Sequence, residues 1–172
     1  MKKNLLAGLL AAVLFQLLVL TGMYASAAMP LWSGTEIRVA TVPVDPRSLF
    51  RGNYARLGYH FSRLEGRIYS SERMLRSGEV VYVSLQPGDT GLYEFAGMSL
   101  EKPRQGAFIR GRVESHYRNE GVDSIRINYG IEAFFAPRAK AIALEKALAD
   151  GGVAVLMISD SGRAALKDVL GQ

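Results

Sequence analysis

Residues 35–61 read TEIRVATVPVDPRSLFRGNYARLGYHF, and this stretch decides the fold expected for the chain. Apolar and polar side chains alternate in residues 35–42 and again in residues 54–61, which is the period of a half-buried strand. Pro43 ends the first of these strands, and the Asp45-Pro46 turn follows it. The stretch therefore predicts two strands of a β domain, separated by a turn.

Further strands are expected at short intervals, at residues 79–85, 92–97, 107–115, 123–129 and 153–158. Residues 138–149 have an apolar and a polar side at helical spacing and predict one late helix. Residues 163–170 are expected to return as a hairpin, with a short C-terminal helix as the alternative. No βαβ alternation is present, which predicts an α+β fold of mainly antiparallel strands, a small barrel or a sandwich.

Composition limits the classes of function. The chain has 172 residues, enough for one domain and a short appendage. The net charge of +5 is dispersed among acidic residues, so nucleic-acid binding is not expected. Cysteine is absent, which excludes disulfides, thiolate metal sites and a cysteine nucleophile.

The N-terminal segment predicts a membrane anchor. Residues 5–24 read LLAGLLAAVLFQLLVLTGMY and carry no charge, and as a helix they span about 30 Å. Lys2 and Lys3 place the N-terminus in the cytoplasm and the rest outside the inner membrane. A retained anchor over residues 1–28 is favoured, and a signal peptide cleaved after Ala27 is the alternative.

Residues 29–34 are expected to be a linker and residues 35–172 an extracytoplasmic, periplasmic domain. Two arginines on the corner after the first strand, Arg47 and Arg51, could bind a carboxylate or phosphate. The simpler interpretation is a rigid corner in which Arg47 pairs with Asp45.

A second cluster follows at Tyr129-Gly130-Ile131-Glu132. Glu132 lies beside an apolar run, and we expect it to be buried and paired with an arginine near Gly52. The two histidines, His60 and His116, are expected on strand surfaces, because neither has acids at ligand spacing. The sequence therefore predicts no metal and no cofactor.

The residues of the two clusters resemble the GDYXXLXY protein family. Gly52, Tyr54, Leu57 and Tyr59 hold its motif as GNYARLGY, and YGIE with Phe135 and Pro137 is similar to its second block. The motif's Asp is Asn53 here, and Arg138 stands where the family has an acid. The resemblance implies a membrane-anchored protein of unknown function, often encoded beside a polytopic membrane protein, and supplies no catalytic residues.

Three hypotheses follow. The leading one is a non-enzymatic accessory domain that binds a polytopic membrane protein or an envelope ligand through residues 45–59. The second is a hydrolase of signal-peptidase type with Ser33 and Lys102, and the third is self-association through Gln16 and Gly8 of the anchor. The expected binding residues are Asp45, Arg47, Arg51, Gly52, Asn53, Tyr54, Leu57, Tyr59, Tyr129, Gly130 and Glu132.

Overall fold

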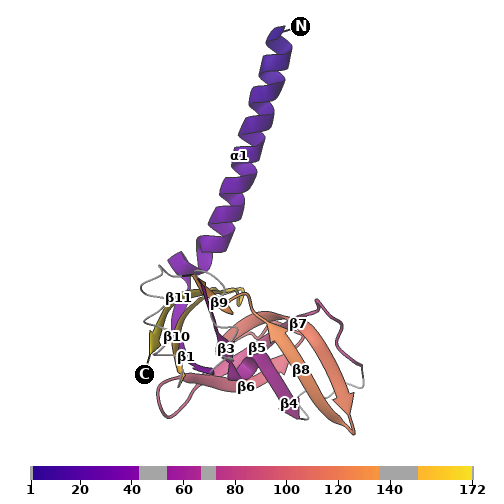
Figure 1. Cartoon of the computed structure of the whole chain (residues 1–172), viewed down its shortest axis with the longest axis vertical. Helices are drawn as coiled ribbons and strands as arrows, with labels where there is room; N and C mark the ends of the chain where they lie inside the picture. The colour runs from indigo at the N-terminus through magenta and orange to yellow at the C-terminus, as the bar shows by residue number, and fades with distance from the viewer. Residues whose placement is uncertain (1, 43–53, 67–72, 136–150, 172) are drawn as a thin grey trace.

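The structure is a computed structural model that describes residues 2–42, 54–66, 73–135 and 151–171. A long N-terminal helix stands away from a β domain (Figure 1). The long helix that the structure describes is the N-terminal one. The late helix was expected at residues 138–149, which lie outside the described residues.

Helix α1 (Lys2–Ser33) is apolar all round, and most of its described side chains are exposed. Residues 4–33 are long and apolar enough to cross a membrane, and the most apolar part of them is not buried in the protein. An unpacked helix of this kind is stable only in an apolar solvent. The helix continues to Ser33, so the residues expected to form a linker are helical up to that point.

Five antiparallel strands form the larger sheet, in the order β4-β8-β7-β5-β6. They are β4 (Arg63–Gly66), β5 (Val80–Pro87), β6 (Tyr93–Ser99), β7 (Ala107–Asn119) and β8 (Val122–Asn128). The sequence placed β5 to β8 within a few residues of these bounds, because their alternating pattern is a local signal.

A four-stranded sheet has the order β11-β10-β1-β3, also antiparallel, and a two-stranded sheet pairs β2 with β9. Their strands are β1 (Thr35–Val42), β2 (Tyr54–Arg56), β3 (Gly58–Tyr59), β9 (Ala133–Phe135), β10 (Gly152–Ile158) and β11 (Ala164–Gly171). A 3-10 turn, η2 (His60–Ser62), follows β3. The hairpin expected at the C-terminus is confirmed as β10–β11.

The sheets enclose one core, so the antiparallel β class is confirmed, with the sheet curled as a half-barrel (Figure 1). Among the described residues, seven apolar members of this core are fully buried: Val39, Val81, Val83, Ile109, Ile125, Ala154 and Leu156. Their alternate neighbours along the strands are more exposed. This is the alternation that the sequence predicted.

The helix and the β domain are joined closely. The Gly34 amide donates to the Pro30 carbonyl at 2.9 Å. A Cβ at Gly34 would press on that carbonyl oxygen and lie 3.0 Å from the Ile158 backbone, so the glycine permits the close approach. Arg163 Nη1 also donates to Ser26 Oγ at 2.8 Å, which ties α1 to the start of β11.

Candidate functional site

The two sequence clusters lie side by side in the fold. Tyr54 in β2 pairs with Phe135 in β9, and the strands run antiparallel from there. The Leu57 amide then donates to the Glu132 carbonyl at 2.8 Å. The backbone that follows the corner is therefore attached directly to the second cluster.

Two buried tyrosines fasten this junction from opposite sides. Tyr59 Oη donates to the Ile131 carbonyl at 2.8 Å, and Tyr129 Oη donates to the Phe61 carbonyl at 2.6 Å. The Phe61 ring lies between them, stacked on Tyr59 and edge-on to Tyr129, with both centroid distances 5.3 Å. Burial is the main reason that the pKa of both tyrosines is raised above the ordinary value, because it disfavours the charged phenolate. The nearby Glu132 carboxylate raises the pKa further through charge repulsion.

Glu132 closes the turn between β8 and β9. Its Oε1 accepts from the Tyr129 amide at 2.6 Å and its Oε2 from the Gly130 amide at 2.8 Å. Gly130 has a φ of 82°, which an L residue rarely adopts, so the turn requires glycine. The expected ion pair with an arginine near Gly52 involves residues outside the described part of the chain.

The structure thus separates the expected binding residues into groups. Leu57, Tyr59 and Tyr129 are buried, and their hydrogen bonds hold the junction together. Gly130 is exposed. The remaining residues of the corner, Asp45, Arg47, Arg51, Gly52 and Asn53, lie in residues 43–53, outside the described residues.

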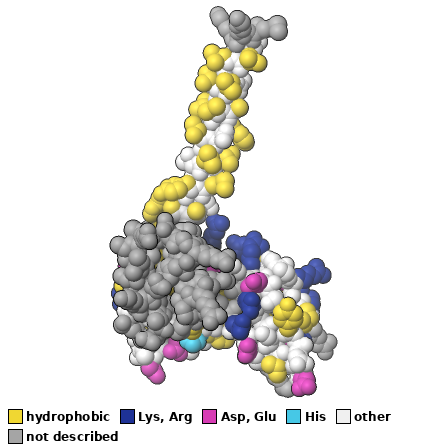
Figure 2. Space-filling model, viewed as in Figure 1, with side chains coloured by type: hydrophobic (Ala, Val, Ile, Leu, Met, Phe, Trp, Pro, Cys, Tyr) yellow, Lys and Arg dark blue, Asp and Glu magenta, His cyan; other side chains and the backbone are white. Residues whose placement is uncertain are grey.

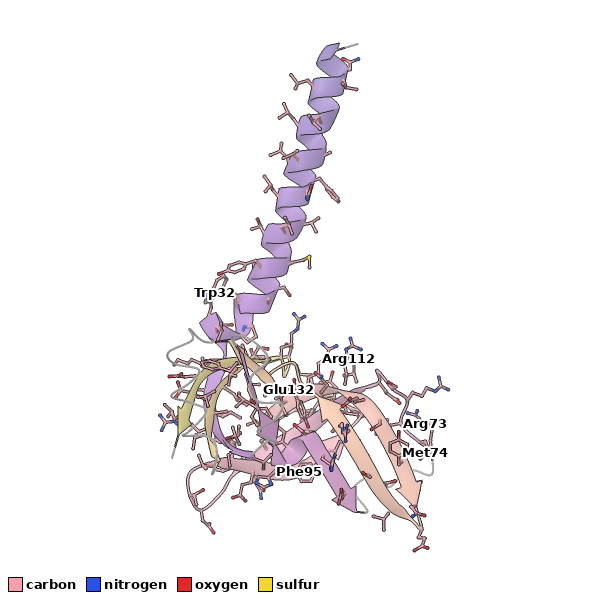
Figure 3. The ribbon with its side chains drawn as sticks, viewed as in Figure 1. Trp32, Arg73, Met74, Phe95, Arg112 and Glu132 are labelled. Carbon is pink, nitrogen blue, oxygen red and sulfur yellow. The ribbon has the colours of Figure 1, made fainter. Side chains whose placement is uncertain are left out.

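A cavity of about 410 Å³, here called the juxtamembrane cavity, lies between α1 and the β domain. It is lined by Ser26, Ala27, Pro30, Arg110, Gly111, Arg112, Asn128, Tyr129, Gly130, Arg163 and Ala164. Arg112 points toward the side of the domain on which α1 stands (Figure 3). Sequence reasoning missed this cavity, although Tyr129 and Gly130 line it.

Glycine at position 111 shapes the cavity floor. A Cβ there would lie 2.8 Å from Cε1 of the Tyr129 ring and would also press on the Ile127 side chain. Because the glycine has none, the tyrosine lies across β7 and reaches Phe61 with its hydroxyl. The cavity and the tyrosine junction are therefore parts of one arrangement.

A larger cavity of about 690 Å³ lies at the start of β1, lined by Thr35 and Ile37 and by residues that include Tyr93, Lys102, Arg104, Phe108 and Asp160. Lys102 Nζ lies 5.8 Å from the centroid of the Phe108 ring.

The residues proposed for a hydrolase are occupied elsewhere. Ser33 Oγ donates to the Met29 carbonyl within α1 at 3.2 Å, and Lys102 lies over the Phe108 ring. Both residues are described, and no hydrogen bond joins them. A serine nucleophile needs a base within hydrogen-bond distance, so this pair gives the hydrolase hypothesis no support.

One polar cluster was not foreseen. His60 is exposed as expected, but the His116 side chain is fully buried, so its expected place on a strand surface is wrong. Its Nδ1 accepts from the Leu75 amide at 2.8 Å, and its Nε2 is 2.9 Å from Asp123 Oδ1. Arg118 Nε binds the same Oδ1 at 2.6 Å, and this hydrogen bond, with that of His116, lowers the pKa of Asp123.

The cluster of His116, Arg118 and Asp123 stabilises the fold. Its hydrogen bonds fasten the segment around Leu75 to the β7–β8 hairpin, because the imidazole accepts from a backbone amide and donates to a carboxylate. A ring nitrogen that already accepts a hydrogen bond is not available to a metal. Among the described residues, no group of three or more His, Cys, Asp or Glu side chains is placed to hold a metal ion.

Comparison with known families gave one match. The model described as GDYXXLXY protein matches residues 16–169, which reach from the middle of α1 to β11. Both sequence clusters, the juxtamembrane cavity and the His116 cluster fall inside the matched region. Comparison with curated proteins and with solved structures gave no match.

Proposed function

The chain belongs to the GDYXXLXY protein family. From this membership and the geometry, we propose that it is a non-enzymatic, membrane-anchored accessory protein. Its β domain binds a polytopic membrane protein, or another envelope ligand, through residues 45–59. The observation that carries the proposal is the close union of α1 with the β domain.

That union fixes the height of the domain above the bilayer. The Arg163–Ser26 hydrogen bond connects α1 to the β domain. Gly34, the residue between α1 and β1, also lies close to the Ile158 backbone of β10. A domain that reaches far for soluble partners needs a flexible linker. A domain held at the membrane surface meets instead the loops of proteins embedded in the same membrane, which favours a polytopic partner.

The orientation follows from charge. Lys2 and Lys3 precede the apolar run, and the next basic residue is Arg38. The positive-inside rule then places the N-terminus in the cytoplasm and the β domain outside the inner membrane. The anchor is retained in this proposal, since its uncharged run is longer than the apolar part of an ordinary signal peptide.

The tyrosine junction supports a role for residues 45–59 in binding. Tyr59 and Tyr129 fasten β3 and the turn after β8 to each other, and the Leu57 amide adds a third hydrogen bond. The chain directly after the corner is therefore fixed to the domain. A partner that binds the corner is thereby connected mechanically to the whole domain.

The experiment is affinity purification of the full-length protein in mild detergent, with bound proteins identified by mass spectrometry. Wild type is compared with Arg51→Ala, and with Arg126→Ala as a control that removes the same charge from an exposed position on β8. We expect one polytopic membrane protein with wild type and control, and its loss with Arg51→Ala. Identical partners for all three proteins would remove residues 45–59 from partner binding.

A further inference from the structure

The juxtamembrane cavity lies at the level where α1 leaves the bilayer. Tyr24 contacts Trp32 edge-on, with a centroid distance of 6.4 Å, and such aromatic residues lie at the headgroup level. Ser26 and Pro30 line the cavity about 3 and 9 Å farther along the helix. The headgroup layer is about 5–8 Å thick on each side of the bilayer. Ser26 therefore lies within the headgroup layer and Pro30 at its outer edge, which places the cavity where it can meet the headgroups.

The charge of the cavity is positive and uncompensated. Arg110, Arg112 and Arg163 line it, and among the described residues none of the three forms an ion pair with a carboxylate. Arg112 donates to the Gly78 carbonyl and Arg163 to Ser26 Oγ, which leaves most of their five N–H donors available. Lysine and arginine side chains gather on the domain beside the end of α1 (Figure 2).

The chemistry of this lining fits a phosphate ester. A guanidinium presents paired N–H groups that match two phosphate oxygens, which an ammonium cannot do. Ala27, Pro30 and Ala164 supply an apolar wall beside the charges. A volume of about 410 Å³ is in the range of sites for small molecules and is too small for a protein domain.

We propose that the juxtamembrane cavity binds the phosphate headgroup of an acidic membrane phospholipid. The proposal rests on the anchored function proposed above, because it needs α1 to remain in the bilayer. The three arginines hold the phosphate, and the apolar wall contacts the glycerol that joins it to the acyl chains. Headgroup binding then fixes the tilt of the β domain on the membrane.

The test is native mass spectrometry of the full-length protein in detergent, with phosphatidylglycerol or phosphatidylcholine added. We expect wild type to retain phosphatidylglycerol at least about tenfold more tightly than phosphatidylcholine, because only the former is a net anion. The triple variant Arg110→Gln/Arg112→Gln/Arg163→Gln loses this preference. Equal retention of both lipids by wild type would overturn the proposal.

A matched control removes the same charge elsewhere. Arg38→Gln/Arg63→Gln/Arg126→Gln changes three exposed arginines on strands outside the cavity and keeps the preference. Equal losses in both triple variants would show general attraction between a basic protein and an acidic lipid, which contradicts a built site. Addition of inorganic phosphate distinguishes the source of the anion, because displacement of the lipid by millimolar phosphate would show a site for free anions.

A further variant guards against misfolding. The Arg110 side chain makes no hydrogen bond or ion pair among the described residues, so Arg110→Gln removes a phosphate ligand and breaks no internal polar contact of that part of the chain. We expect a several-fold loss of phosphatidylglycerol with an unchanged melting temperature, and no loss would overturn the proposal. The same spectra give the intact mass, so a cleaved anchor is detected separately from a cavity that does not bind lipid.

Discussion

The change Tyr129→Phe removes one hydroxyl from the junction between the two motif blocks. That hydroxyl donates to the Phe61 carbonyl at 2.6 Å, and the tyrosine is only 8% exposed. The phenylalanine ring fills the same space, so no cavity forms. The loss is then that of a hydrogen bond with its acceptor left buried, which costs about 1–3 kcal/mol.

For a domain of this size, each kcal/mol lowers the melting temperature by about 2–4 °C. We therefore expect Tyr129→Phe to melt about 2–12 °C below wild type. The symmetric change Tyr59→Phe removes the bond to the Ile131 carbonyl and has a similar effect. Thermal unfolding of the full-length protein in detergent, followed by circular dichroism of the β domain, measures both.

The control is Tyr117→Phe, the same chemical change at a position on β7 that is 69% exposed. A surface substitution of this kind changes stability by less than about 0.5 kcal/mol. If Tyr129→Phe and Tyr117→Phe melt at the same temperature, the junction does not stabilise the domain. Residues 54–61 would then not be fixed to the second block by these hydrogen bonds.

Three further results are expected. Tyr59 and Tyr129, two of the eight tyrosines, should resist ionisation, because their pKa is raised in the folded state. Their contribution to the free energy of unfolding is complete below the unfolded pKa near 10 and falls above it, so ultraviolet titration should show these two phenols ionising only on unfolding. Asp123→Asn removes the carboxylate that binds Arg118 and His116, and we expect it to cost about 3 kcal/mol in chemical denaturation at neutral pH. The pKa of Asp123 is lowered in the folded state, so the carboxyl of the unfolded wild type is protonated first, from about pH 3.8 downward, and the difference between the two proteins shrinks until the folded carboxyl is protonated too. A difference that does not depend on pH would contradict this. Gly34→Ala presses on the Pro30 carbonyl and should speed proteolysis between α1 and β1, whereas Gly22→Ala, with open space around it, should not.

The strands could be predicted from the sequence because their signal is local. Residues 35–42 alternate strictly, and the structure gives β1 the same bounds. Residues 54–61 alternate too, but the pattern is divided in the structure, with β2 pairing to β9 and β3 pairing to β1. A period of two residues says which side chains are buried and does not say which strand is the neighbour.

The contacts that build the site are long-range, and that is why they were missed. Arg110 and Arg163 come from β7 and from the turn before β11, and they meet because the Arg110 amide donates to the Gly162 carbonyl. His116 accepts from the Leu75 amide, 41 residues away. Every residue except proline has a backbone amide, so the sequence does not indicate which amide a buried side chain such as His116 will bind.

The tyrosines of the motif show a different limit. Tyr59 and Tyr129 were expected to bind a partner, and the structure buries both. Tyrosine is common both in cores and on binding surfaces, because it joins an apolar ring to a polar tip. Only the position of the hydroxyl, on a carbonyl of the opposite block, shows that these two hold the domain together.

The most direct test of the account is the intact mass of the protein extracted from cell membranes. The proposed function and the headgroup site both require α1 to remain attached to the β domain. We predict a membrane-bound protein with the mass of the full chain, 18.8 kDa, apart from changes at the first methionine. A smaller protein that begins at Ala28 would show that residues 1–27 are a signal peptide, and it would contradict the anchored account.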